Sequence, residues 1–235
     1  MDTTLTDIKA IRAEIRDMCP DIDTLNDEQV VEYYFRLCKQ ARAAAPEKNE
    51  SLFLPPFEDE GFTSFVAYAI ETTGLSPYTD SMIEIGAVRV VNGRLSDSRT
   101  HTFHTYVHPY KKSINSNITA LTGITNEMVR DAPEMWDAFN GFADVIGNDI
   151  VLGYNNHRFD DKFMERAAKF AKRRIDNKSF DVMKYVRRYK EPFGIENVRL
   201  ATISEYLGIV NPNAHTAVAD AVTTARVYLT ILGMK

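Results

Sequence analysis

The sequence predicts an α/β fold in which helices flank a mixed β-sheet, with a small helical appendage at the N-terminus. Three segments rich in apolar, β-branched and aromatic residues come first, at 65–70, 82–91 and 100–108. Two shorter apolar segments then alternate with stretches of helical periodicity. Strands followed by mixed helices and strands are typical of a sheet packed between helices.

The first 45 residues have the pattern of two helices. Asn26 is placed to cap the second helix, which ends before Pro46. Two helices of this size cannot bury a core alone, so they must pack on the larger domain, on a copy of themselves or on a partner protein. The apolar stripe of the first helix repeats at three- and four-residue steps through Leu5, Ile8, Ile11, Ile15 and Met18.

A segment rich in proline and acidic residues, 46–61, is the predicted linker to a main domain at 62–235. In this domain Asn92 and Gly93 predict a tight hairpin, because both residues adopt a positive φ readily. The later expected strands are 149–154 and 179–182, and the expected helices are about 133–146, 160–174, 198–207 and 216–232.

The composition is that of a globular protein, with 44% hydrophobic and 26% charged residues among 235. No run of eighteen apolar residues occurs, and the N-terminus lacks the apolar core of a signal peptide, so we expect a cytoplasmic protein without membrane contact. A net charge of −5 argues against nonspecific coating of polyanions. Cys19 and Cys38 match no zinc spacing and are expected to be reduced.

Acidic residues stand at the ends of several predicted elements. Ala69 and Glu71 share one face at the end of the first strand, because side chains alternate along a strand. Asp160 falls where a helix begins and, by itself, favours a helix cap. Asp220 lies near the apolar side of the last helix, shortly after His215. A carboxylate there needs a partner, and a divalent cation would be one.

Five segments resemble, in order and spacing, the motifs of the DEDDh 3′-to-5′ exonucleases, a family that includes the proofreading subunit of bacterial DNA polymerase III. The resemblance covers about 62–233 and implies a ribonuclease H-like fold. The segments are IETTGLSPYTDSMIEIGAVRV, LTGITNEMV, NNHRFDDKF, VRLATISEYLGI and HTAVADA.

The first motif departs from the family pattern, Asp-x-Glu-Thr-Thr-Gly, because Ala69 stands where the family has aspartate. The resemblance implies a pair of Mg²⁺ or Mn²⁺ ions, with Glu71, Asp160 and Asp220 as the remaining ligands and His215 as the base. The missing aspartate would bridge both ions. An intact remainder around one truncated side chain favours a deliberate inactivating substitution over general decay, and we expect weak metal binding and very slow turnover.

By the same resemblance, the substrate is single-stranded DNA or RNA with a free 3′ end, and the products are nucleoside 5′-monophosphates. Leu75 could wedge against a base, and Asp181 reads as a helix cap. The residues expected to meet the terminal nucleotide are Thr72, Thr73, Gly74, Leu75, Gly123, Ile124, Asn156 and Phe159.

A basic stripe lies along the helix that Asp160 begins, and contact between this stripe and a nucleic-acid backbone is one hypothesis. The stripe is Lys162, Arg166, Lys169 and Arg173, beside an expected buried face of Phe163, Ala167, Phe170 and Ala171.

Two other functions stay open at this stage. One is a noncatalytic module that binds nucleic acid in the same groove. The other is a trimming factor that residues 1–45 recruit to a protein partner. The preference for DNA or RNA and the biological pathway are not readable from these residues.

Overall fold

The computed structural model describes residues 21–26, 29–30, 61–95, 102–110 and 112–233. The chain divides into two compact units, residues 1–49 and 50–235. In the first unit a 3₁₀ helix, η1, spans Ile22–Thr24. The side chain of Asn26 accepts from the backbone N–H of Gln29 at 2.9 Å. In turn, the side chain of Gln29 accepts from the backbone N–H of Asn26, also at 2.9 Å. The predicted cap at Asn26 is therefore confirmed.

The other predictions for the N-terminal region lie outside the described residues. These are the two appendage helices, the linker apart from Gly61, and the state of Cys19 and Cys38.

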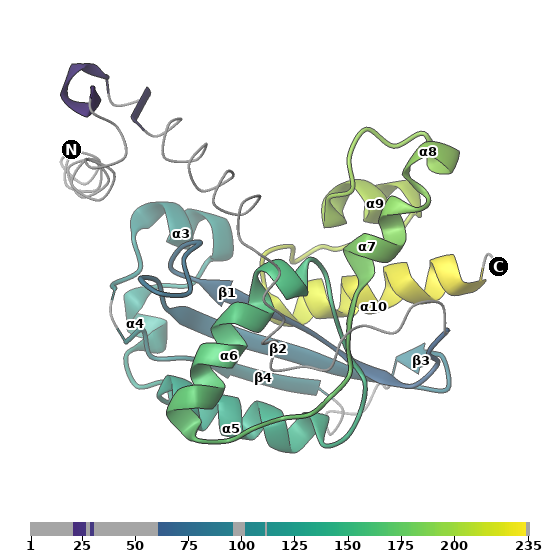
Figure 1. Ribbon diagram of the computed structural model, residues 1–235, viewed down its shortest axis with the longest axis horizontal. Helices are drawn as coiled ribbons and strands as arrows, with labels where there is room; N and C mark the ends of the chain where they lie inside the picture. The colour runs from purple at the N-terminus through teal and green to yellow at the C-terminus, as the bar shows by residue number, and fades with distance from the viewer. Residues whose placement is uncertain (1–20, 27–28, 31–60, 96–101, 111, 234–235) are drawn as a thin grey trace. The chain divides into compact units, whose positions relative to one another are not determined.

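The main domain is built on a mixed sheet with the strand order β3-β2-β1-β5-β6, in which β4 also pairs with β2 (Figure 1). β1 runs antiparallel to β2 and parallel to β5, and β5 runs parallel to β6. The sheet confirms the predicted fold class. The strands are β1 Phe65–Thr72, β2 Met82–Val91, β3 Arg94–Leu95, β4 Thr102–Tyr106, β5 Val151–Gly153 and β6 Ser179–Asp181.

The predicted hairpin joins β2 to β3. Asn92 and Gly93 at its tip have φ values of 49° and 74°. Two successive residues with positive φ match the twist of an antiparallel ribbon, which explains why this dipeptide turns the chain.

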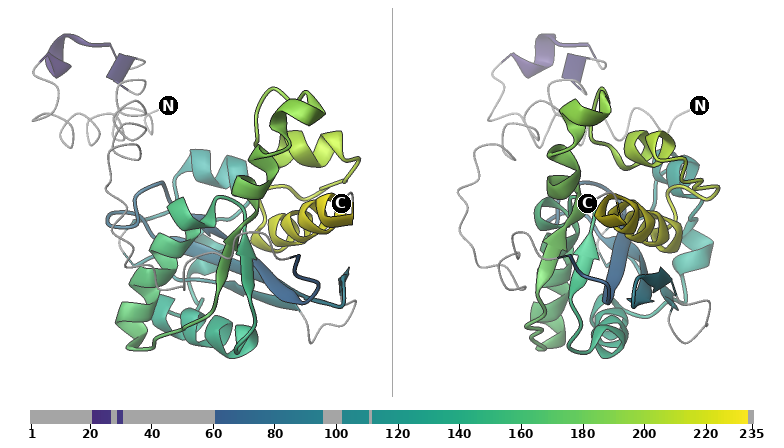
Figure 2. Two further views of the ribbon diagram at one scale, coloured as in Figure 1. Left: turned by 45° about the vertical axis from the view of Figure 1, so that its right-hand side comes forward. Right: turned by 90° about the vertical axis from the view of Figure 1, so that its right-hand side faces the viewer.

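Helices cover both faces of the sheet (Figures 1 and 2). The four predicted helices correspond to α5, α6, α9 and α10, while several shorter helices were not predicted. The helices are α3 Ser116–Thr122, α4 Asn126–Val129, α5 Met135–Ile146, η3 Asn156–Arg158, α6 Asp160–Ala171, α7 Val182–Arg187, α8 Lys190–Phe193, α9 Leu200–Tyr206 and α10 Ala217–Gly233.

The two faces hold separate apolar clusters. Tyr68 packs with Phe142 and Phe163 in the cluster on the side of α5 and α6. Phe65 packs with Tyr228 in the cluster on the side of α7 and α10. Alternation along β1 then places Ala69 and Glu71 on one face with Phe65, as predicted, and this face is the α10 side.

The buried face of α6 differs from the prediction at Phe170, which is 48% exposed. Met164 and Ala168 are buried instead. Because α6 packs against both the sheet and α5, side chains on two adjacent rows of this helix are buried. Three of the four cations of the predicted basic stripe contact the protein itself. Lys162 pairs with Glu165, Arg166 donates to two backbone carbonyls, and Arg173 pairs with Asp144.

Across the described ranges, none of the helices combines the length and the apolar character that a membrane crossing requires.

Candidate functional site

The end of β1 is the place where the predicted site residues gather. The first turn of α10 approaches the sheet closely at Gly86, where an added Cβ would lie 2.2 Å from the backbone nitrogen of Val218. Gly86 pairs with Ala69 across β1 and β2. Only glycine permits this approach, which brings the start of α10 onto β2, next to the strand that carries Glu71.

Asp160 and Asp220 lie close enough to Glu71 for their charges to influence its ionisation. The pKa of Glu71 is raised to about 9, first by burial and then by the charges of Asp220, Glu84 and Asp160. Burial also raises the pKa of Asp220. Within the described residues, no lysine or arginine forms an ion pair with any of these three predicted acids. The cluster is a concentration of negative charge that a cation would relieve.

Asp160 is anchored to β1 and does not cap its helix. Its Oδ1 accepts from the backbone N–H of Ile70 at 3.1 Å. β5 pairs with β1 at Val66 and Ala67 and ends at Gly153, so Ile70 lies beyond the paired stretch and its N–H needs another acceptor. Burial, and then the charge of Asp161, raise the pKa of Asp160 to about 8. The interpretation of Asp160 as a cap is therefore wrong, because no side chain caps α6.

His215 adjoins Asp220 from an exposed turn before α10. Its charge and its backbone N–H both lower the pKa of Asp220, against the larger effect of burial. The amide of Asn211 assists by donating to Asp220 at 2.9 Å. His215 has a φ of 67°, which is unusual for a residue other than glycine and is more frequent at functional sites.

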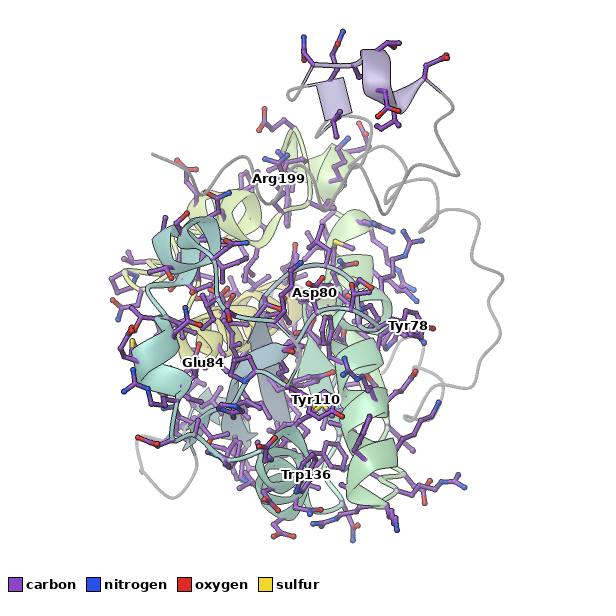
Figure 3. All side chains as sticks on the ribbon, turned by 90° about the vertical axis from the view of Figure 1, so that its left-hand side faces the viewer. Tyr78, Asp80, Glu84, Tyr110, Trp136 and Arg199 are labelled. Carbon is purple, nitrogen blue, oxygen red and sulfur yellow. The ribbon has the colours of Figure 1, made fainter. Side chains whose placement is uncertain are left out.

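Glu84 is a fourth acid at this site that the sequence interpretation missed. It lies opposite Glu71 on β2 and is only 3% exposed (labelled in Figure 3). Its Oε2 accepts from the N–H of Ala217 at 2.9 Å, and its Oε1 lies 2.7 Å from Nε2 of His104. Because Ala217 is the first residue of α10, Glu84 holds the start of the helix that carries Asp220. A glutamate inside the apolar strand MIEIGAV was the available signal.

The donor types fit a hard divalent cation, although the arrangement is incomplete. Carboxylate oxygens are the ligands that Mg²⁺ and Mn²⁺ prefer, and Glu71, Asp160 and Asp220 supply them. Among the described residues, however, no three His, Cys, Asp or Glu side chains form a group that could hold one ion. Ala69, on the same face of β1 as Glu71, has a methyl group that adds no ligand to this cluster.

The last residue of β1 and the loop that follows carry four of the predicted substrate residues, and this loop is fixed from several directions. Thr72 Oγ1 donates to the carbonyl of Gly74 at 2.6 Å, and Thr73 exchanges hydrogen bonds with Ser81. A Cβ at Gly74 would lie 2.4 Å from the carboxylate of Asp80, so a larger residue here would displace that carboxylate. Leu75 is 42% exposed and free to contact a ligand.

Asp80 organises the rest of this loop. Its carboxylate accepts from the N–H of Ser76 at 2.9 Å and from Nζ of Lys112 at 3.2 Å. Arg166 donates to the carbonyls of Pro77 and Asp80, each at 2.9 Å. The loop is therefore held between α6 and the segment that follows β4.

The other predicted substrate residues have mixed positions. Gly123 is exposed at the end of α3 with a φ of 74°, while Ile124 is buried beside Ile83.

Asn156 is fully buried and donates to Asp161 at 3.2 Å and to Ser179 at 2.8 Å. Phe159 is partly buried against Phe163, and Asp181 caps α7 as predicted.

Residues 66–228 match a family model described as exonuclease, RNase_T. The chain is 34% identical over 168 residues to the PolC-type DNA polymerase III of Caldanaerobacter subterraneus, covering 72% of this chain and 11% of that protein. It is 31% identical over 170 residues to DNA polymerase III subunit epsilon of Aquifex aeolicus, covering 72% of this chain and 80% of that protein. The chain thus spans about a tenth of the PolC-type relatives.

Solved structures of exonuclease I have the same fold. The zinc-bound complex of E. coli exonuclease I with single-stranded DNA has a TM-score of 0.65 and 22% identity, covering 74% of this chain and 41% of that chain. The complex of the same enzyme with a dT13 oligonucleotide has a TM-score of 0.63 and 22% identity, covering 72% of this chain and 41% of that chain. The predicted ribonuclease H-like fold is confirmed by this likeness.

Proposed function

The chain belongs to the RNase_T exonuclease family, and from that premise we propose that residues 62–235 form a 3′-to-5′ exonuclease domain for single-stranded nucleic acid, disabled in hydrolysis by Ala69. The observation that carries this proposal is the convergence of Glu71, Asp160 and Asp220 at the end of β1, beside His215. The reaction releases nucleoside 5′-monophosphates from a free 3′ end.

Each side chain has a defined task in this proposal. Glu71, Asp160 and Asp220 would hold two Mg²⁺ or Mn²⁺ ions. When bound, the ions would lower the pKa of water and neutralise charge on the entering and leaving oxygens. A ring nitrogen of His215 accepts the proton of the attacking water, the general-base role that histidine fills most often in enzymes. The ordered loop from Thr72 to Leu75 orients the terminal nucleotide against β1.

Ala69 accounts for the expected loss of hydrolysis. Ala69 precedes Ile70, whose backbone N–H donates to Asp160, and it pairs with Gly86 across β1 and β2. Its side chain lies on the same face of β1 as that of Glu71. A carboxylate at this position would be central to all three remaining acids. Without it, the ion sites lose a shared ligand, and we expect weak binding of Mn²⁺ in a calorimetric titration.

The decisive test restores the carboxylate with Ala69→Asp and uses Ala69→Asn as the control of similar size. We expect Mg²⁺-dependent degradation of 3′-ended single strands to rise at least about 100-fold for the aspartate form and not for the asparagine form. Matched DNA and RNA oligonucleotides with free or blocked 3′ ends measure both polarity and sugar preference.

Absence of any gain, with binding of the oligonucleotide retained, would support the noncatalytic module instead. Two-site Mn²⁺ binding of micromolar affinity by the Ala69 chain would also contradict the proposed defect.

The role of residues 1–45 as a docking element for a protein partner is a separate proposal. Deleting residues 1–60 should leave the cleavage rate of the Ala69→Asp form unchanged and abolish capture of the partner. A comparable loss of cleavage would instead make this segment part of the catalytic fold.

A further inference from the structure

A pocket of about 340 Å³ lies at the segment that follows β4 and at α4, apart from the acidic cluster. Its size is within the range of sites that hold small ligands. The residues that line it are His108, Pro109, Tyr110, Lys112, Ser113, Asn126, Val129 and Arg130.

The charge of this lining is opposite to that of the acidic cluster. The lining contains two cationic side chains and one imidazole but no carboxylate, although the net charge of the chain is −5. Lys112 is 53% exposed and contacts Asp80 at 3.2 Å, which leaves two of its three N–H donors for a ligand. Arg130 is 68% exposed and lies 4.0 Å from Glu127, a separation at which the guanidinium keeps its donors for an anion.

The walls of the pocket are fixed before any ligand arrives. The side chain of Asn126 exchanges two hydrogen bonds with the backbone of Ile114, each at 2.9 Å. The backbone N–H of His108 donates to Pro133 at 2.9 Å, and its Nδ1 lies 3.2 Å from the carbonyl of Val129. A rigid site loses less entropy on binding, which favours a specific ligand.

An aromatic pair adjoins the pocket on the same surface. Tyr110 is 51% exposed and packs against Phe170, which is 48% exposed, with ring centroids 6.0 Å apart. The guanidinium of Arg166 lies 5.8 Å from the centroid of Phe170. Exposed aromatic rings beside cations are the combination with which proteins hold single-stranded nucleic acid.

The pocket is joined to the loop after β1 by direct contacts. Lys112, in the lining, binds Asp80, and Asp80 fixes the loop that carries Gly74 and Leu75. Figure 3 shows Asp80 and Tyr110 on one face of the main domain, with Tyr78 beside them. A single strand of nucleic acid whose 3′ end lies at this loop would extend along this face to reach the pocket.

We propose that this pocket, which includes Tyr110, binds a nucleotide two or more positions to the 5′ side of the terminal one, with its phosphate against Arg130 and Lys112 and its base stacked on Tyr110. This inference rests on the proposed function, because it extends the same single strand from the end of β1. The ligand class is a single-stranded nucleic acid of at least several nucleotides.

Binding by the Ala69 chain, which leaves the oligonucleotide intact, tests the inference by fluorescence anisotropy. We expect Tyr110→Ala to weaken binding of a single-stranded decamer roughly tenfold. We expect Arg130→Gln to reduce the slope of log affinity against log salt by about 0.7, the value for one phosphate contact. Tyr206→Ala is the matched control, because Tyr206 is 49% exposed and also stacks on a phenylalanine, Phe193, at 4.7 Å. An equal loss for Tyr110→Ala and Tyr206→Ala, or no loss for either, would overturn the proposal.

The length of the substrate separates this inference from the proposed function. In the Ala69→Asp form, Tyr110→Ala should raise KM for the decamer and leave cleavage of a dinucleotide unchanged. A parallel fall in dinucleotide cleavage would mean that Tyr110 acts through the fold, and the inference would fail. If Ala69→Asp cleaves nothing while Tyr110→Ala still weakens decamer binding, the proposed hydrolysis fails and the pocket stands.

Discussion

Asp160 and Asp161 are neighbours in the chain, yet they lie in opposite environments. Asp161 accepts from the hydroxyl of Tyr68 and from the amide of Asn156 on the α6 side of the sheet. Asp160 belongs to the acidic cluster, and its charge contributes to the raised pKa of Glu71. Both are buried, and burial raises both pKa values, to about 7 for Asp161 and about 8 for Asp160.

The difference lies in the partners that the protein supplies. The donors of Tyr68 and Asn156 lower the pKa of Asp161 and stabilise its charge. At Asp160 the backbone N–H of Ile70 acts in the same direction, but the charge of Asp161 opposes it. Two donors of the fold hold Asp161 in place although the charges of Glu165 and Asp181 oppose them, whereas the charge of Asp160 adds to the cluster around Glu71, which a cation from outside would relieve.

The largest expected effect compares the two aspartates by the same substitution. Asp161→Ala should destabilise the protein by about 3 kcal/mol, because it removes the acceptor of two buried donors. Asp160→Ala should cost less than about 1 kcal/mol without metal, because removing a carboxyl whose burial raises its pKa to about 8 relieves unfavourable desolvation and offsets the lost bond to Ile70. Urea unfolding at pH 7.5 in the presence of a chelator measures both. Equal losses would show that the two acids are not distinguished by their partners.

The next prediction concerns pH and requires no substitution. The folded pKa values of Glu71 and Asp160, about 9 and about 8, lie above the values near 4 of the unfolded chain. Between these limits the folded state holds more protons than the unfolded state, so the free energy of unfolding should fall as pH rises from about 4 to 9. Thermal melting without metal measures this slope.

Two changes should flatten that dependence. Glu71→Gln removes the most strongly shifted carboxyl of the cluster, and Mn²⁺ added to the Ala69→Asp form supplies the opposite charge. A slope that neither change alters would place the responsible groups elsewhere in the protein.

The smallest expected effect concerns the acid that holds α10. Glu84→Ala should cost about 1–2 kcal/mol, because the N–H of Ala217 loses its acceptor at the start of the helix. Glu84→Gln keeps an oxygen for that N–H and should recover most of the loss in urea unfolding. In the Ala69→Asp form we expect Glu84→Ala to lower kcat more than it raises KM, because it displaces Asp220 rather than the substrate loop. The opposite split would argue against this positioning role.

The predictable part of this protein comes from local chemistry. β1 and β2 follow from continuous β-branched and apolar segments, Asn92-Gly93 specifies its own turn, and Asn26 caps by a bond across three residues. α6 starts at Asp160, as predicted. The capping role of Asp160 was wrong, because its carboxylate accepts from the N–H of Ile70 on β1, 90 residues earlier in the chain. Phe170 was misplaced for a related reason, because periodicity identifies an apolar row and not which neighbour covers it.

The sequence by itself determined the main strands and the longer helices, the fold class and the spacing of the acids with Ala69 among them, because these depend on propensity, alternation and short-range hydrogen bonds. The tertiary structure decided which acids meet. Gly86 admits α10 to the sheet, Glu84 fixes the start of that helix, and the early end of β5 leaves Ile70 to Asp160. These are contacts between residues far apart in the chain, and their geometry is set by packing, which no local pattern encodes.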